Sequence, residues 1–447
     1  MADGGGVQIV FDTINRQKLC IDFFGYVFHL KKNHTFAVIN FNVSIKHKTM
    51  IKKSLFCLFI FAGSLSLFAQ NGENEEYVFT IVKEVKATPV KNQARSSTCW
   101  SYAALSFFES ELLRTGKPEY DLSEMWIVRH TYPAKAEKFM RLHGNLNLAP
   151  GGSFEDALWV MRNYGIVPQD VYQGLNYGED KNVHGELDAA TRAYADAILR
   201  TAERSGSTGL TTGWMNGFEG IMDAYLGKRP EKFNHNGREY TPKSFMQSLD
   251  LNLDDYVAIT SFTHHPFYQP FVLEIPDNWI WGAYHNIPMG EMLEIVNYAL
   301  NNGHSVLWAA DVSERGFAYR KGVAAVPITN IEEMSDSDRA RWIGLSDRER
   351  ETQILNLDKT VAEKPITQEM RQLAFDNFQT TDDHGMHITG IAKDQNGKTF
   401  YKVKNSWGVE DSKYDGYLYV SEAFFLYKTI NILVHKNAIP KNISLIR

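Results

Sequence analysis

Three short stretches of the sequence carry side chains suited to nucleophilic chemistry. The first, NQARSSTCW, places Gln93 six residues before Cys99. The second, DHG, contains His384, and the third, NSWG, begins at Asn405. Together they offer a thiol nucleophile, an imidazole base, an amide that orients the base and an amide donor for an oxyanion. These parts predict acyl transfer through a thioester.

The residues after Cys99 have the spacing of a helix. The apolar residues fall at helical spacing, at i, i+4, i+5 and i+9: Ala103, Phe107, Phe108 and Leu112. We therefore expect a helix over 99–113, with an N-cap among residues 96–98. Backbone N–H groups and the positive end of the helix dipole would then favour the thiolate of Cys99.

Residues 50–69 have the three parts of a secretory signal peptide. Met50 opens a short basic start, residues 54–68 form an apolar run, and Ala69-Gln70 offers a small-residue cleavage site. The run is shorter than the ~20 residues of a spanning helix, so we expect a cleaved signal and no stable membrane span. We further expect that Met50 is the true initiator, that residues 1–49 are an over-extended start outside the natural protein, and that the exported domain covers 70–447.

The cysteine count supports a reactive thiol. The chain has three cysteines: Cys20, Cys57 and Cys99. The first two lie in segments that we expect to be absent from the mature protein. Cys57 lies in the middle of the apolar run and not at its end, which argues against lipidation. Cys99 is then left without a disulfide partner in an exported protein, which indicates a reactive group.

Composition narrows the class of partner. Of the 447 residues, 44% are hydrophobic and 22% charged, and the formal net charge is −6. Because no basic stripe stands out, we expect no nucleic acid partner. No HExxH and no paired CxxC motif occurs, so we expect no metal and no cofactor. His264 and His265, just before Pro266, are interpreted as loop histidines.

Periodicity divides the chain into a helical half that carries Cys99 and a strand-rich half that carries His384 and Asn405. The sequence predicts helices over 157–164, within 185–225, over 291–301 and, on the surface, within 331–375. It predicts strands over 77–86, 305–311, 387–392, 399–404, 416–421 and 429–435, with an Asn-Gly hairpin signal between 392 and 399. This order favours an α+β fold of two lobes with a cleft between them.

At this point the motifs resemble those of the papain-like cysteine peptidases, and most of all the bleomycin hydrolase and aminopeptidase C branch. The spacing identifies the branch. A papain-like histidine usually follows the cysteine by about 130–150 residues, but His384 follows Cys99 by 285. The matching pieces are Asn92-Gln93, Ser96-Ser97, Cys99-Trp100, Gly151-Gly152, Tyr164 to Pro168, Asp383 to Met386 and Asn405 to Gly408.

The resemblance implies a role for each catalytic residue. Cys99 would be the nucleophile, and His384 would take its proton and later protonate the leaving amine. The side chain of Asn405 would hold the imidazole in the useful tautomer. Gln93 would donate an N–H to the oxyanion together with the backbone N–H of Cys99.

The resemblance also implies a fold and a peptide-binding surface. It implies a helical lobe and a β-barrel-like lobe, with a large, mainly helical insertion at roughly 180–375. Trp407 would cover the histidine–asparagine hydrogen bond from water. Gly151 and Gly152 would let a substrate backbone approach the protein backbone. Peptides are the expected substrates, and a homo-oligomer is possible because the branch is typically hexameric.

Some assignments have a rival. His387 lies three residues after His384, but the two have opposite parity in a strand and so point to opposite faces. We prefer His384 because its neighbours match the motif. Gln93 could instead be a solvated loop residue, and Gly151-Gly152 could be a plain turn before a helix.

The mode of cleavage stays open at this stage. In the branch, a C-terminal arm brings a carboxylate to the free amine of the substrate, whereas residues 437–447 form a shorter tail here. An aminopeptidase would need another group for that amine, such as an acid within 331–375. The alternatives are an endopeptidase with an open cleft, an acyltransferase with an amine acceptor, and an inert peptide-binding homologue.

Overall fold

A computed structural model describes residues 76–205 and 209–445, together with four strands near the N-terminus. The chain divides into two units, 1–73 and 74–447, and each is described by itself. In the first unit, four strands form a sheet in the order β2-β1-β3-β4, with bounds Gln8–Asp12 (β1), Lys18–Asp22 (β2), Phe28–Asn33 (β3) and Phe36–Asn40 (β4). The predicted signal peptide at 50–69 lies outside the described residues.

The second unit is built on a large mixed sheet, with strand order β12-β13-β16-β15-β14-β11-β17-β8-β10-β9 and β5 paired to β14. The strands are Thr80–Glu84 (β5), Tyr256–Thr260 (β8), Pro270–Val272 (β9), Ala283–Asn286 (β10), Val306–Ala310 (β11), Phe317–Ala318 (β12), Val323–Ala324 (β13), His384–Lys393 (β14), Thr399–Lys404 (β15), Tyr417–Ser421 (β16) and Thr429–His435 (β17). A separate hairpin joins Phe233–His235 (β6) to Arg238–Tyr240 (β7).

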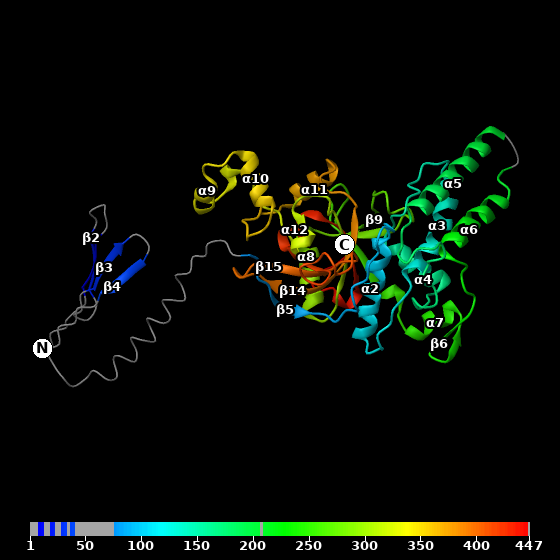
Figure 1. The fold of residues 1–447 in the computed structure, drawn as a ribbon, viewed down its shortest axis with the longest axis horizontal. Helices are drawn as coiled ribbons and strands as arrows, with labels where there is room; N and C mark the ends of the chain where they lie inside the picture. The colour runs from blue at the N-terminus through cyan, green and yellow to red at the C-terminus, as the bar shows by residue number, and fades with distance from the viewer. Residues whose placement is uncertain are drawn as a thin grey trace. The chain divides into compact units, whose positions relative to one another are not determined.

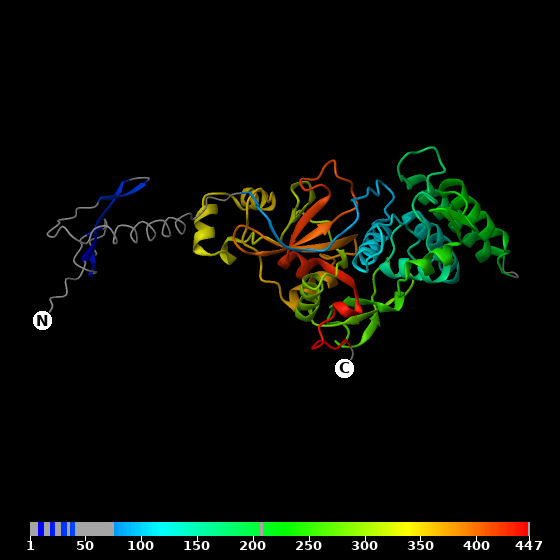
Figure 2. The same cartoon turned by 90° about the horizontal axis from the view of Figure 1, so that it is seen from below.

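The helices before residue 250 lie together at one side of this sheet, whereas the later helices lie over the sheet and at its other side (Figures 1 and 2). Their bounds are Cys99–Arg114 (α2), Glu124–Arg141 (α3), Phe154–Tyr164 (α4), Gly185–Ser205 (α5), Gly213–Leu226 (α6), Pro242–Leu249 (α7), Met289–Asn301 (α8), Asp336–Trp342 (α9), Asp347–Leu355 (α10), Gln368–Asp376 (α11) and Glu422–Lys428 (α12). Helix α2 packs against β14 and β11 and also against α3 and α4. It is therefore the element that joins the helical lobe to the sheet. Among the described residues, no helix has both the length and the apolar composition of a membrane crossing.

Most predicted elements form where the local pattern was strong. Helix α2 begins at Cys99 as expected, and strand β15 coincides with the predicted 399–404. Strand β14 starts at His384, three residues before the predicted start. The range 180–375 contains α5 to α11, but it also supplies β8 to β13 to the main sheet.

Helix α3 was not predicted, because both its apolar and its charged residues are buried. Glu124, Arg129 and Lys135 are each 1% exposed. A helix that is buried on every side has no separate apolar and polar faces. Its sequence therefore lacks the hydrophobic period of 3.6 residues by which a surface helix is predicted. Its N-terminus is capped by Ser123, whose hydroxyl accepts a hydrogen bond from the backbone N–H of Trp126.

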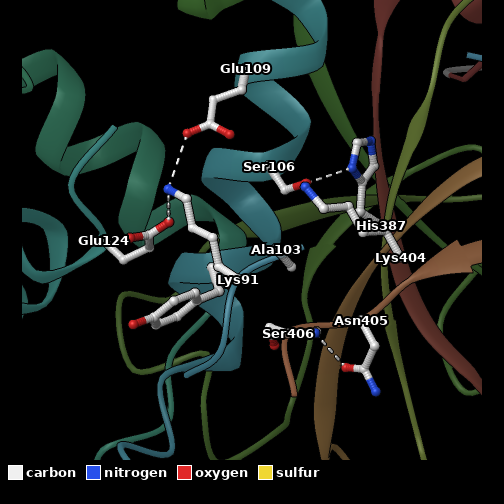
Figure 3. A pocket seen from close by; sticks show the side chains of 11 residues that line it. Lys91, Ala103, Ser106, Glu109, Glu124, His387, Lys404, Asn405 and Ser406 are labelled. Carbon is white, nitrogen blue, oxygen red and sulfur yellow. Dashed lines mark hydrogen bonds and ion pairs between the residues drawn. The ribbon is translucent and has the colours of Figure 1, made fainter. Parts of the chain in front are cut away.

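A buried network of charged groups fastens α2 to its neighbours (Figure 3). Lys91 donates to Glu109 of α2 at 3.3 Å and to Glu124 of α3 at 2.6 Å. The hydroxyl of Thr88 donates to Glu109 at 2.6 Å. Because the carboxylates are 1% exposed, these partners offset a desolvation cost that would otherwise oppose folding.

Lys404, at the end of β15, extends the network to the sheet (Figure 3). Its ammonium donates to Ser106 Oγ of α2 at 2.8 Å and to Thr88 Oγ1 at 3.1 Å. Burial lowers the pKa of Lys404 to about 8. The side chain thus fixes α2 against β15 one residue before Asn405.

We expect Lys404→Met to lower the free energy of unfolding by about 1.5–3 kcal/mol, because it removes hydrogen bonds from a buried charged donor. Lys402→Met is the matched control on the same strand. Lys402 pairs with the half-exposed Glu84, so we expect its loss to cost less than about 1 kcal/mol. Urea unfolding of both variants measures the difference, and equal losses would contradict a fastening role for Lys404.

Candidate active site

Cys99 lies where the first turn of α2 meets the start of β14. Its Sγ atom accepts a hydrogen bond from the backbone N–H of Gly385 at 3.5 Å. The side chain is only partly exposed. It lines a narrow pocket together with Trp100, Gly152, Ser153, Phe154, Ile275, Asp277, Ala309, Asp382, Asp383, His384, Gly385 and Asn431. The structure therefore brings the predicted nucleophile and the predicted base into one pocket.

Gly385 permits this close approach. A Cβ atom at Gly385 would lie 3.0 Å from Phe154 Cε1 and 3.2 Å from the Cα of Trp100. Distances of this size are tighter than ordinary van der Waals contact. A larger residue would push β14 away from the helix that carries Cys99.

The imidazole of His384 is held by Asn405 and covered by Trp407. His384 Nε2 and Asn405 Oδ1 are 2.7 Å apart, and the same oxygen accepts from the backbone N–H of Ser406 at 2.8 Å. Since Oδ1 accepts, Nε2 carries the proton and Nδ1 is the nitrogen left for the thiol. The ring of Trp407 lies 4.7 Å from the imidazole centroid at an interplanar angle of 32°, so it shields this bond from water.

The protein environment favours the uncharged form of the Cys99 thiol and of the His384 imidazole when each group is considered by itself. Burial raises the pKa of the Cys99 thiol to about 12, and the carboxylates of Asp277 and Asp382 add to that rise. Burial lowers the pKa of His384 to about 4, and the hydrogen bond that its imidazole donates to Asn405 acts in the opposite direction. Proton transfer from Sγ to Nδ1 creates opposite charges that stabilise each other, and the N-terminus of α2 favours the thiolate.

Gln93 is fixed by the segment that follows Asn405. Its backbone N–H donates to the carbonyl of Ser406 at 2.8 Å, and its Oε1 accepts from Ser406 Oγ at 2.6 Å. The side-chain oxygen is thus occupied, while the Nε2 atom makes no hydrogen bond with the described residues and remains a donor. Gln93 does not line the pocket that holds Cys99, but it is joined through Ser406 to the residue that orients His384.

The predicted glycine pair lies beside the same pocket. Gly152 lines it, and a Cβ there would lie 2.8 Å from the indole of Trp100. Gly151 lies next to it, and its carbonyl accepts a hydrogen bond from the buried ammonium of Lys135 on α3. Lys135 also binds the carbonyl of Ala149 at 2.8 Å. The turn before α4 is therefore held in place by a lysine that sequence patterns did not reveal.

His387 does not reach this pocket. It is fully buried on the opposite face of β14, where Nδ1 lies 2.9 Å from Ser106 Oγ. It belongs to the network around Lys404 shown in Figure 3. The parity argument that separated His384 from His387 is thus consistent with the structure.

The two loop histidines contact a residue that does not line the pocket of Cys99. His264 and His265 both approach the exposed carboxylate of Glu274, at 3.2 and 2.8 Å. Their nitrogens and a Glu274 oxygen lie within 4.8 Å of one another, a grouping that spacing alone did not predict. Hydrogen bonds account for the arrangement.

Three polar residues of the pocket were not identified from the sequence: Asp277, Asp382 and Asn431. Asp382 carried a signal, because it lies two residues before His384. Asn431 carried another, as a polar residue between apolar neighbours in strand β17. Asp277 lies in an irregular segment between β9 and β10, where no periodicity marks it.

Comparison with known proteins agrees with this geometry. The model of the Peptidase C1-like family matches residues 137–342 and 343–446, which include His384 and Asn405. Aminopeptidase C of Listeria monocytogenes is 24% identical over 80% of this chain and 83% of its own length. Aminopeptidase C of Streptococcus thermophilus is 23% identical over 82% and 84%.

A solved structure shows the same fold. The crystal structure of pepw from Lactobacillus rhamnosis is 18% identical, covers 88% of this chain and 94% of its own, and superposes with a TM-score of 0.61. The papain-like α+β architecture and the resemblance to the aminopeptidase C branch are thereby confirmed. The chain belongs to the Peptidase C1-like family, and it is a cysteine-type peptidase.

Proposed function

We propose that this chain is an exported cysteine aminopeptidase that removes N-terminal residues from peptides. The observation that carries the chemistry is the shared pocket of Cys99 and His384, with His384 bound to Asn405 at 2.7 Å. The aminopeptidase mode is supported by the relatives, which are named aminopeptidase C in Listeria monocytogenes and Streptococcus thermophilus and aminopeptidase G in Lactobacillus delbrueckii.

The reaction proceeds in two acyl-transfer steps. His384 Nδ1 takes the thiol proton, and the Cys99 thiolate attacks the peptide carbonyl to form a C–S bond. The imidazolium then gives that proton to the leaving amine as the C–N bond breaks. Water, deprotonated by His384, attacks the thioester and releases the acid and the free thiol. Gln93 Nε2 and the backbone N–H of Cys99 donate to the oxyanion in both steps.

Positioning residues support these steps. Asn405 fixes the imidazole plane, and Trp407 excludes water from the His384–Asn405 bond. Gly152 lets the pocket wall pack closely against Trp100. Because Asn405 is 3% exposed, the hydrogen bond that orients the base lies in a low-dielectric environment, where it is strong.

Export is supported by the pattern at 50–69: a basic start at Met50, an apolar run too short to span a bilayer and a small-residue cleavage site. The reduced thiol of Cys99 needs no partner cysteine for this reaction. The enzyme would act outside the cytoplasm with the mature chain beginning near Gln70.

Replacement of the two histidines distinguishes their roles. We expect His384→Gln to lower kcat/KM for peptide hydrolysis by about 10²–10⁴, the usual value of a positioned acid–base group, with little change in Tm. We expect His387→Gln to lower Tm while the folded fraction, counted by alkylation of Cys99, keeps kcat within a few-fold. The reverse pattern would assign the base to His387.

A pair of fluorogenic peptides tests the mode of cleavage. The mature chain from Gln70 is given one peptide with a free N-terminus and the same peptide N-acetylated, with Cys99→Ala as the control. We expect a preference of at least about 10-fold in kcat/KM for the free amine, because a desolvated charge-assisted contact is worth that factor or more. Equal or better cleavage of the acetylated peptide would identify an endopeptidase with an open cleft.

The start of the mature protein is directly measurable. Expression from Met50 in a bacterium with an export pathway should yield protein outside the cytoplasm whose first residue lies near Gln70. Phe59→Arg places a charge in the apolar run and should leave the precursor uncleaved. Peptides from residues 1–49 in the natural protein would contradict the proposed start.

A further inference from the structure

The pocket beside Cys99 is strongly acidic. Three carboxyl groups line it: Asp277, Asp382 and Asp383. No lysine or arginine is among its lining residues in the described chain. Glu155 of α4 lies close behind, with Oε1 buried and without a hydrogen-bond partner. A pocket lined in this way is suited to a cation.

Asp382 is the carboxyl group with no partner of its own. Asp277 accepts a hydrogen bond from Asn147 Nδ2 at 3.2 Å, and Asp383 accepts from Thr381 Oγ1 at 2.7 Å. Asp382 makes neither a hydrogen bond nor an ion pair with the described residues. Burial raises its pKa well above the usual range, and the charged groups that act on it, Asp277, Asp383 and Glu155, are all carboxylates. The neighbouring carboxylates thus repel a charge on Asp382, whereas the ammonium of Lys135 acts on Asp277.

A second observation in the same pocket points to a ligand. Asn431 of β17 lines it, is 3% exposed, and its Oδ1 has no hydrogen-bond partner in the described chain. Buried amide oxygens are nearly always hydrogen-bonded, so one without a donor marks a place for a bound group. The residue opposite Asn431 on β11 is Ala309, whose small side chain leaves space above the amide.

The C-terminal tail does not supply this pocket with a group as far as it is described. Ile443 is buried with the hydrophobic residues that surround α8, and Asn442 Nδ2 donates to Glu294 of α8 at 3.0 Å. No residue from 432 to 445 lines the pocket of Cys99. Among the described residues, the groups that line the pocket come from the body of the peptidase domain.

The geometry points to Asp382 as the residue that binds the α-ammonium group of the substrate's N-terminal residue, with Asp277 and the Asn431 amide oxygen beside it. This inference rests on the proposed aminopeptidase function. In an N-terminal residue, only two bonds separate the amine nitrogen from the carbonyl carbon that Cys99 attacks. The amine site must therefore share the pocket of the nucleophile, which is where Asp382 lies. Ammonium N–H groups would satisfy both the carboxylate and the orphan amide oxygen.

The test compares Asp382→Asn with Asp170→Asn in the mature chain. Asp170 is exposed and outside the pocket, so its replacement controls for the change in net charge. Three fluorogenic substrates are used. The first has a free N-terminal alanine, and the second is its desamino analogue, in which a propionyl group replaces the alanine. The third is an acetylated dipeptide with arginine in the penultimate position, so that its cation is on a side chain. Alkylation of Cys99 counts the folded sites.

We expect Asp382→Asn to lower kcat/KM for the free-amine substrate by about 10- to 100-fold, mainly through KM. The propionyl substrate should be cleaved as before, and Asp170→Asn should match the wild type on all three. An equal loss on the free-amine and propionyl substrates would overturn the inference, because the residue would then act on the chemistry or the fold. A loss confined to the arginine substrate would overturn it too, since the pocket would then bind a side-chain cation.

The wild type separates this inference from the function on which it rests. If the wild type does not prefer the free amine, the aminopeptidase function fails and the role of Asp382 fails with it. If the wild type prefers the free amine and Asp382→Asn keeps that preference, only the inference fails.

Discussion

The whole site depends on how closely the first turn of α2 approaches the start of β14. Cys99 and His384 are 285 residues apart in the sequence, and they share a pocket only because a glycine follows the histidine. At Gly385 a Cβ would meet Phe154 and Trp100 at 3.0 and 3.2 Å. The backbone N–H of Gly385 instead points at the thiol. Nucleophile and base are thus positioned by backbone contact, which is more rigid than contact between long side chains.

Apolar packing alone would leave the register of α2 on the sheet loosely specified, and buried polar pairs restrict it. Ser106 and Glu109 lie about two and three turns into the helix from Cys99, and they meet Lys404 and Lys91. A shift of the helix by one residue would leave these groups buried without partners, at a cost of about 1–3 kcal/mol for each neutral group and more for each charged one. Figure 3 shows the network together with Asn405, which follows Lys404 at the end of β15. Stability and catalytic geometry therefore rest on the same contacts.

The acidic pocket couples recognition to the nucleophile. Asp277 and Asp382 oppose formation of the Cys99 thiolate by their charge. An ammonium group bound between them offsets that charge, so a substrate with a free amine favours the thiolate that will attack it. With a substrate that carries no cation, the two carboxylates still oppose formation of the thiolate. The same electrostatics thus disfavours an exposed, oxidisable thiolate in the free enzyme.

Local pattern was enough to predict α2 from its first residue and the strands β14, β15 and β17, because helix and strand periods are properties of neighbouring residues. The motifs also singled out Cys99, His384 and Asn405 as candidate site residues. The sequence could not reveal α3, since its charges are buried with its apolar residues. Nor could it place Asp277, Asp382 and Asn431 together, because three distant segments meet only after the sheet forms. Whether a polar group keeps a partner is decided by what packs against it, so the unpartnered carboxyl and amide beside Cys99 are a product of tertiary structure alone.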